Sequence, residues 1–169
     1  MRIFLTGASG YLGSAVLDAC VRAGHSVTGL VRNSEKAAYV TERGGHPVIG
    51  TLGNPASYQQ AARGHDAYLL AAFEPSARGP EIDRITIETI LAVAKGPRGG
   101  SRQGAGVQGP AVVVYTSGIW VIGNAPVPAD ETAPLDPTPL VAWRPQHEQL
   151  VLEASAETLR TVVLRPGIV

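Results

Sequence analysis

The stretch that decides the fold is Ile3-Phe4-Leu5-Thr6-Gly7-Ala8-Ser9-Gly10-Tyr11-Leu12-Gly13. An apolar run typical of a buried strand leads into glycines spaced three apart, and a helical pattern follows them. Gly7 permits a tight turn out of the strand, Gly10 allows the backbone to approach a pyrophosphate, and Gly13 lets the helix pack closely. The start of that helix offers free N–H groups and a positive dipole end. This order favours a phosphate-binding turn over a glycine-rich turn without a ligand.

The composition is typical of one α/β domain. The 169 residues are enough to bury a core, with 44% hydrophobic and 17% charged residues. The formal net charge is zero and no basic run occurs, which argues against nucleic acid or an acidic membrane as a partner. No apolar run reaches the length of a membrane span, and the first residues are expected to form a core strand rather than a signal peptide. We therefore expect a cytoplasmic protein.

The single cysteine and the four histidines give no sign of redox or metal chemistry. Cys20 falls on the apolar face of the first expected helix, where a small buried hydrophobic side chain is favoured over a catalytic thiol. The spacing of the histidines does not match that of metal ligands, so no metal site is predicted at His25, His46, His65 or His147.

Strands and helices are expected to alternate along the chain. Apolar runs predict strands over residues 2–5, 26–31, 47–50, 67–72, 111–116 and 161–164. Helical periodicity and capping residues predict helices over 12–23, 34–43 (capped by Ser34), 54–62, 82–94 and 145–157. Repeated β-α-β units with apolar strands predict a doubly wound parallel α/β sheet of about six strands, a Rossmann fold with helices on both faces. In such a sheet, ligands bind beyond the carboxyl ends of the strands.

The glycine pattern, with Thr6 before it and Tyr11-Leu12 inside it, resembles the extended and atypical short-chain dehydrogenase/reductase superfamily, in particular its epimerase/dehydratase and NmrA-like branch. This resemblance runs through essentially the whole chain and implies an NAD(P)-binding Rossmann domain over residues 1–169. Members of that family continue into a substrate domain, so we expect either a fragment of a longer protein or a minimal dinucleotide-binding domain, and we favour the fragment. The implied cofactor contacts of the first turn are Gly7, Ala8, Ser9, Gly10, Tyr11, Leu12 and Gly13.

Cofactor choice depends on the end of the second expected strand, Leu30-Val31-Arg32-Asn33-Ser34. NAD-preferring Rossmann proteins present an Asp or Glu there, which accepts a hydrogen bond from the ribose 2′-hydroxyl. Arg32 cannot accept that bond, but its planar donors suit a 2′-phosphate, and Asn33 or Ser34 adds a donor. The sequence therefore predicts NADP(H) in preference to NAD(H), with a solvated Arg32 as the alternative.

Other strand ends carry the remaining expected contacts. Family members commonly show Gly-Asp-Leu after the third strand, whereas this chain has Gly50-Thr51-Leu52, which changes the contact near the adenine. Small residues at the fourth strand end resemble those that admit the ribose, although strand packing also requires them. Arg165-Pro166-Gly167 resembles the segment beside the nicotinamide. These further cofactor contacts are Thr51, Leu52, Ala71, Ala72, Thr116 and Pro166.

The family's catalytic set is a Ser/Thr, a Tyr and a Lys, which position the substrate and pass a proton. Residues 114–123 resemble the family's fifth-strand segment, but alignment on Val121 and Gly123 puts the Ser/Thr position at Gly118. Alignment of the following helix on its glutamate puts Leu140 at the tyrosine and Arg144 at the lysine. The standard proton relay is therefore absent.

Neighbouring side chains are candidates to replace that relay. Ser117, Thr116 and Tyr115 are hydroxyls near the expected site, although structural hydrogen bonds at a strand end are the alternative role for each. Arg144 suits a cofactor ribose or a substrate anion, but it stays protonated at neutral pH and cannot donate a proton. Trp120 either stacks near the nicotinamide or anchors a loop. The catalytic candidates are Ser117, Tyr115 and Arg144.

Two functions from different classes remain open. The first is an NADP(H)-dependent oxidoreductase or epimerase/dehydratase acting on a small molecule with a carbonyl or hydroxyl group or on a sugar nucleotide. The second is a non-catalytic NADP(H)-binding redox sensor of NmrA-like type. The helices over 82–94 and 145–157 occupy positions that resemble the family's dimer-forming pair, which suggests a homodimer. Residues 96–110 are expected to form a flexible insertion, and residues 124–139 an irregular loop near the mouth of the site.

Overall fold

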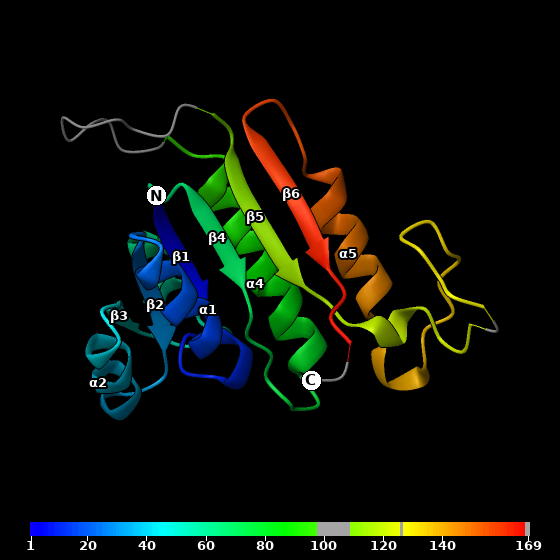
Figure 1. Ribbon diagram of the computed structural model, residues 1–169, viewed down its shortest axis with the longest axis horizontal. Helices are drawn as coiled ribbons and strands as arrows, with labels where there is room; N and C mark the ends of the chain where they lie inside the picture. Colours follow the sequence, from blue (N-terminus) through cyan, green and yellow to red (C-terminus); the bar gives the residue numbers. More distant parts are fainter. Residues whose placement is uncertain (98–108, 126, 168–169) are drawn as a thin grey trace.

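The structure is a computed structural model that describes residues 1–97, 109–125 and 127–167. Its centre is a six-stranded sheet in the order β3-β2-β1-β4-β5-β6, in which every pairing is parallel (Figure 1). The strands are β1 (Arg2–Thr6), β2 (Ser26–Val31), β3 (His46–Ile49), β4 (Ala67–Leu70), β5 (Ala111–Thr116) and β6 (Leu159–Leu164). The predicted doubly wound parallel sheet is confirmed.

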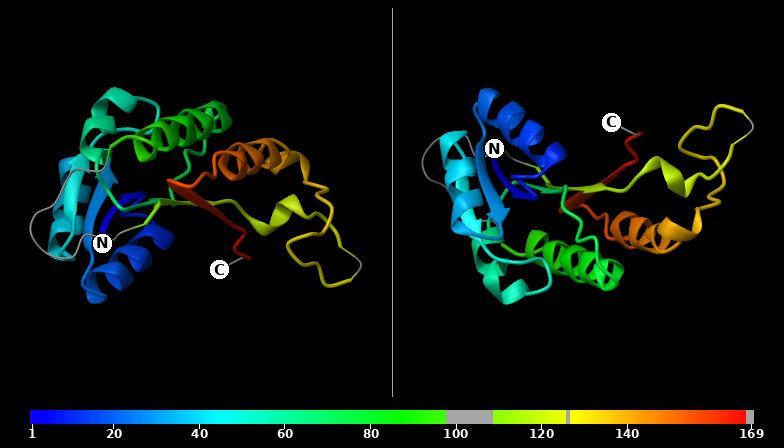
Figure 2. Two further views of the ribbon diagram at one scale, coloured as in Figure 1. Left: turned by 90° about the horizontal axis from the view of Figure 1, so that it is seen from above. Right: turned by 90° about the horizontal axis from the view of Figure 1, so that it is seen from below.

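Helices cover both faces of the sheet, as Figure 2 shows with the sheet seen edge-on. The helices are α1 (Tyr11–Arg22), α2 (Ser34–Glu42), α3 (Gln59–Ala62), α4 (Gly79–Ala94) and α5 (Arg144–Glu153). Short 3-10 turns are η1 (Pro55–Ser57), η2 (Ile119–Val121) and η3 (Pro139–Val141). None of the helices among the described residues is long and apolar enough to cross a membrane.

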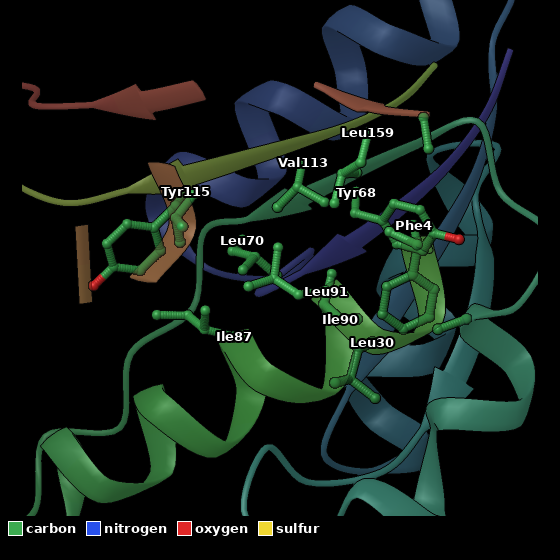
Figure 3. Close-up of a cluster of buried hydrophobic side chains, with 14 of the residues drawn as sticks. Phe4, Leu30, Tyr68, Leu70, Ile87, Ile90, Leu91, Val113, Tyr115 and Leu159 are labelled. Carbon is green, nitrogen blue, oxygen red and sulfur yellow. The ribbon is translucent and has the colours of Figure 1, made fainter. Parts of the chain in front are cut away.

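Two apolar clusters fix which helix lies on which face. On one face, Leu17 of α1 and Val40 of α2 are fully buried with residues of β1 and β2. On the other face, side chains of α3, α4 and α5 pack against β1, β4 and β5 (Figure 3). Because successive residues of a strand point to opposite faces, Phe4 joins the second cluster while its neighbours Ile3 and Leu5 join the first. The same alternation along β5 determines which of its side chains face α4.

Most predicted boundaries agree with the structure within a few residues, and the exceptions have physical reasons. The helix predicted over 54–62 is two pieces, η1 and α3, separated by Tyr58 with φ −140°, whose ring is buried in the core. The helix predicted over 145–157 ends at Glu153, because the chain turns and Leu159 N donates to the Ala156 carbonyl before β6 pairs with β5. Cys20, predicted to be buried, is only half-buried, at the edge of the apolar cluster that contains Leu17 and Val40.

The cap of α2 is Asn33 rather than the predicted Ser34. The Asn33 side-chain oxygen accepts a hydrogen bond from the Lys36 backbone N–H at 2.9 Å, while Asn33 itself has extended φ and ψ. Asn and Ser are both favoured N-cap residues, and the residue that is still extended takes the role.

The two segments predicted to be irregular are described to different extents. Most of the insertion predicted over 96–110 lies outside the described residues, which include only Gly96, Pro97, Gly109 and Pro110 of it. The loop over 124–139 is described except at residue 126 and has no regular element before η3. Its far end is tied to η2, where Asp136 N donates to the Val121 carbonyl at 3.1 Å.

Candidate functional site

The turn between β1 and α1 has the geometry that its glycines predict. Gly7 has φ +72°, and a Cβ there would lie 2.8 Å from the Ala71 carbonyl oxygen. A Cβ at Gly13 would lie 1.9 Å from the Gly7 carbonyl oxygen, so the first turn of α1 packs directly on the backbone. Gly10 is the N-cap of α1 and supplies no side chain, which leaves the first N–H groups of the helix for a ligand. The residues present therefore fit a dinucleotide phosphate.

A groove of about 320 Å³ runs from this turn across the ends of β2 and β4. It brings together most of the predicted cofactor contacts, and its lining includes Gly7, Ser9, Gly10, Arg32, Asn33, Leu52, Ala71 and Ala72. Other predicted contacts lie elsewhere. Ala8 is fully buried beneath the turn, Tyr11 is 79% exposed, and Gly13 serves helix packing. Leu12, Thr51 and Thr116 also lie outside this lining.

The groove ends at a pair of cations. Arg32 is exposed directly after β2, and Lys36 lies in the first turn of α2 on the same groove. Sequence reasoning missed Lys36, although a lysine four residues after Arg32 at a helix start was a visible signal. The oxygen of Asn33 is occupied by the helix cap, so only its amide N–H groups remain to donate to a ligand. This end of the groove is therefore rich in donors.

A second, larger pocket of about 890 Å³ continues from the groove, and Phe73 lines both. It lies beyond the carboxyl ends of β4, β5 and β6, where a doubly wound sheet binds its ligands. Its walls come from segments far apart in the sequence: residues 73–80, 117–120, 139–144 and 166–167. The predicted site residues Ser117, Arg144 and Pro166 line it.

Three side chains stack at the junction of the two cavities. The rings of Phe73 and Trp143 are nearly parallel, with centroids 5.5 Å apart and an interplanar angle of 12°. The Arg144 guanidinium carbon lies 4.5 Å from the Trp143 ring centroid and 5.4 Å from that of Phe73. Such cation–π contacts hold a planar guanidinium in one orientation. Sequence reasoning placed Phe73 at the crevice but missed its stacking on Trp143, because only tertiary packing brings the segment after β4 against the start of α5.

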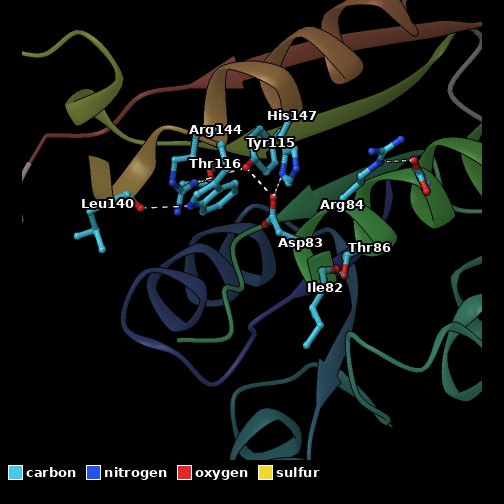
Figure 4. Close-up of polar contacts among 11 residues, drawn as sticks. Ile82, Asp83, Arg84, Thr86, Tyr115, Thr116, Leu140, Arg144 and His147 are labelled. Carbon is cyan, nitrogen blue, oxygen red and sulfur yellow. Dashed lines mark hydrogen bonds and ion pairs between the residues drawn. The ribbon is translucent and has the colours of Figure 1, made fainter. Parts of the chain in front are cut away.

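Arg144 also contacts a buried polar cluster, drawn in Figure 4. Its Nη1 donates to the Tyr115 hydroxyl oxygen and to the Thr116 carbonyl, each at 3.4 Å. The Tyr115 hydroxyl in turn donates to Asp83 Oδ2 at 2.8 Å, and His147 Nδ1 lies 2.8 Å from the same oxygen. This cluster ties β5, α4 and α5 together behind the pocket.

The structure gives Tyr115 a position that does not suit the predicted catalytic role. Alternation along β5 turns its ring toward α4, where it is 1% exposed and outside the pocket lining. Burial and the Asp83 carboxylate raise the pKa of Tyr115 far above its ordinary value. Its hydroxyl is thus a fixed neutral donor to Asp83, and the geometry supports a structural role.

Ser117 has the opposite environment. It follows the last residue of β5, its N–H donates to the Leu164 carbonyl at 2.8 Å, and its side chain lines the pocket. The residue is only 7% exposed, and its Oγ has no hydrogen-bond partner among the described residues. A buried hydroxyl without a partner is costly, so a ligand atom that reached the Ser117 Oγ would gain a hydrogen bond.

A buried ion pair holds the chain next to the pocket. Arg165 Nη2 lies 2.6 Å from Glu148 Oε2, and Arg165 Nε also donates to this carboxylate. Glu148 is 2% exposed, while the Arg165 side chain is 21% exposed. The pair fixes the chain just before Pro166 and Gly167, which line the pocket.

Leu140, at the position where the family resemblance places a tyrosine, is 70% exposed and lines the pocket. Its carbonyl accepts the Trp143 indole N–H at 3.2 Å. Within the described residues, no group of three or more His, Cys, Asp or Glu side chains is placed to hold a metal ion.

Comparison with known proteins identifies relatives of the chain. Residues 7–168 match a protein family described as NAD(P)H-binding. A 4-hydroxy-2-methyl-3-oxo-4-farnesyl-3,4-dihydroquinoline-1-oxide ketoreductase of Stigmatella aurantiaca is 36% identical over 177 residues, covering 100% of this chain and 50% of that protein.

Two solved structures have a similar fold. A short-chain dehydrogenase/reductase superfamily protein from Agrobacterium tumefaciens with bound NAD has a TM-score of 0.72 and 25% identity, over 98% of this chain and 48% of that one. A UDP-glucose 4-epimerase from Stenotrophomonas maltophila with bound NAD has a TM-score of 0.76 and 22% identity, over 98% of this chain and 52% of that one. The chain thus spans about half the length of these relatives. It belongs to the NAD(P)H-binding family and has the Rossmann fold of a short-chain dehydrogenase/reductase-like protein.

Proposed function

We propose that this chain is the cofactor domain of an NADP(H)-dependent oxidoreductase that interconverts a carbonyl and a hydroxyl group on a small molecule. The observation that carries the proposal is that Ser117 and Arg144 line one pocket, which is joined through Phe73 to the phosphate groove. The similarity to a ketoreductase supports carbonyl chemistry in preference to epimerisation or dehydration.

The preference for NADP(H) rests on charge at the end of β2. Arg32 and Lys36 both line the groove there, and neither can accept a hydrogen bond from a ribose hydroxyl. Two cations suit the charge of a 2′-phosphate, and the exposed amide of Asn33 adds a donor. Lys36 is also near Glu35, with Nζ 3.2 Å from Oε1, but both side chains are exposed, so this pair is weak and readily exchanged.

The chain's own residues can assist hydride transfer to a carbonyl. A bound nicotinamide supplies or accepts the hydride. The Ser117 Oγ–H is free to donate to the substrate oxygen, and the Arg144 guanidinium stabilises negative charge that develops there. Because Arg144 stays protonated, we assign the proton to water entering the open pocket. We also assign to Arg144 the role of the family's lysine, which is to hold the nicotinamide ribose.

A second candidate function is a non-catalytic NADP(H) sensor. The observation that favours a sensor is that two catalytic residues of the family are replaced. Leu140 stands at the position of the proton-donating tyrosine, and Arg144 stands at the position of the lysine that lowers the pKa of that tyrosine. A sensor binds the cofactor in a redox-dependent way and changes conformation or partner without turnover.

An assay for hydride transfer distinguishes the oxidoreductase from the sensor. The purified chain is incubated with 4-deuterated NADPH and a panel of ketones and aldehydes, and deuterium in the alcohol product is measured by mass spectrometry. For the oxidoreductase we expect slow transfer, lowered about 100- to 1,000-fold in Ser117→Ala because one oxyanion donor is lost. The double variant Leu140→Tyr/Arg144→Lys should raise the rate, since it restores a positioned acid. Cofactor binding without transfer in any of the three proteins would favour the sensor.

A further inference from the structure

We propose that the large pocket takes a substrate whose reacting carbonyl is carried on a flat, apolar ring system, and that Leu140 and Trp143 select it. This inference rests on the proposed oxidoreductase function and names the substrate class of the same site. It decides between the two chemistries left open by the sequence, a plain carbonyl compound and a sugar nucleotide.

The walls of the pocket offer few groups for hydrogen bonding. Among the described residues that line it, the polar side chains are those of Ser76, Ser117 and Arg144, together with the indole N–H groups of Trp120 and Trp143. Four prolines contribute walls that lack a backbone N–H donor, namely Pro75, Pro80, Pro139 and Pro166. The hydroxyls of a sugar need partners when they are buried, and a pyrophosphate needs more than one cation. A sugar nucleotide would therefore leave polar groups unpaired here, while an apolar ring would not.

Several of the exposed large apolar side chains gather in this pocket, although others lie elsewhere on the surface. Phe73, Ile119, Trp120 and Leu140 are 43%, 44%, 46% and 70% exposed, and all four line it. An exposed patch of this kind marks a binding surface, because burying it against a ligand removes apolar area from water. The volume of about 890 Å³ lies within the range of small-molecule sites.

Trp143 adds apolar surface to the wall, and its ring is already held in place by Phe73, Arg144 and His147. Its indole N–H, the one polar atom of the side chain, is already bound to the Leu140 carbonyl at 3.2 Å. Trp143 therefore has no donor left for a sugar hydroxyl and offers only apolar and π contact. Leu140 adds an aliphatic side chain at the position where a hydroxyl was expected. A flat ring packed on the exposed Leu140 side chain, beside Trp143, can direct its carbonyl oxygen toward Ser117 and Arg144.

Calorimetric titration tests the inference without requiring turnover. The probes are 2-acetonaphthone, which carries its ketone on a flat apolar ring, and UDP-glucose, each added to the chain saturated with NADPH. We expect 2-acetonaphthone to bind at least tenfold more tightly than UDP-glucose. Leu140→Ser should weaken its binding about tenfold through loss of apolar contact. The matched control is Val127→Ser, which alters an aliphatic side chain of similar exposure (68%) outside the pocket lining and should have no effect.

Tighter binding of UDP-glucose, or equal losses in Leu140→Ser and Val127→Ser, would overturn the inference. Failure of the proposed function has a different signature: 2-acetonaphthone binds and responds to Leu140→Ser, but no deuterium is transferred to any carbonyl. The only two tryptophans of the chain, Trp120 and Trp143, line the pocket, so quenching of their fluorescence reports occupancy of this site. Heat of binding of 2-acetonaphthone without such quenching would place it elsewhere and count against the inference.

Discussion

The buried ion pair between Glu148 and Arg165 supports a quantitative prediction. The carboxylate is 2% exposed and accepts from two nitrogens of the guanidinium, at distances down to 2.6 Å. Glu148→Gln keeps the shape but removes the charge, which leaves the guanidinium facing a neutral amide. Breaking a fully buried pair costs about 3–5 kcal/mol, but Arg165 is 21% exposed and water recovers part of this, so we expect about 2–3 kcal/mol.

The chain contains a matched control for this substitution. Arg84 and Glu88 form an ion pair at 2.8 Å on the outer face of α4, with side chains 64% and 48% exposed. The same change, Glu88→Gln, should cost less than about 0.5 kcal/mol because the charges are already solvated. The exposed pair has one hydrogen bond and the buried pair has three, so the comparison measures burial together with the hydrogen bonds that burial protects.

Thermal unfolding followed by circular dichroism measures both variants. At about 2–4 °C per kcal/mol for a chain of this size, Glu148→Gln should lower Tm by about 4–12 °C. Glu88→Gln should lower Tm by no more than about 2 °C. Losses within about 0.5 kcal/mol of each other would refute the reasoning that burial gives the first pair its strength. Pocket binding should weaken along with stability in Glu148→Gln, because Arg165 precedes the lining residues Pro166 and Gly167.

Two further predictions concern the first turn and a buried histidine. In Gly13→Ala the new Cβ would clash with the Gly7 carbonyl oxygen, so we expect a loss of about 3 kcal/mol or more in the free energy of unfolding by urea. In the control Gly53→Ala the nearest contact of the Cβ is 3.5 Å, and the change should be less than about 0.5 kcal/mol. Equal urea midpoints for the two variants would contradict this prediction. Burial lowers the pKa of His65 from its ordinary value of 6.5. The unfolded chain therefore binds this proton more readily than the folded chain. The stability that neutral His65 contributes is present above pH 6.5 and is lost as the pH falls below 6.5. His65→Gln should therefore show a flatter decline in stability between about pH 7 and pH 5, and an unchanged slope would argue against the assignment.

Local patterns were sufficient to predict the sheet and the first turn. The spacing of Gly7, Gly10 and Gly13 indicates that the β1–α1 turn has no room for side chains. The structure agrees, because a Cβ atom added at any of the three would lie too close to backbone atoms. The end of α5 was not predictable in the same way. It depends on the pairing of Leu159 with Ala111, a contact between distant segments.

The residues of the site also divide into those that local sequence predicts and those that depend on contacts between distant segments. Ser117 and Arg144 could be found from the sequence, because strand ends and family alignment place them beyond the sheet. The stacking of Phe73 with Trp143 depends on how the segment after β4 meets the start of α5, and no local pattern encodes that. Asp83 was likewise only one polar residue of an amphipathic helix until tertiary packing placed Tyr115 and His147 on its carboxylate.

The measurement that tests the central claim most directly is a parallel titration of the chain with NADPH and NADH. Energy transfer from Trp120 and Trp143 to the reduced nicotinamide provides the signal, because both line the pocket beside the groove. The account predicts tighter binding of NADPH, by about tenfold or more, and near loss of this difference in Arg32→Asp. Equal affinity for the two cofactors, unchanged in Arg32→Asp, would contradict it.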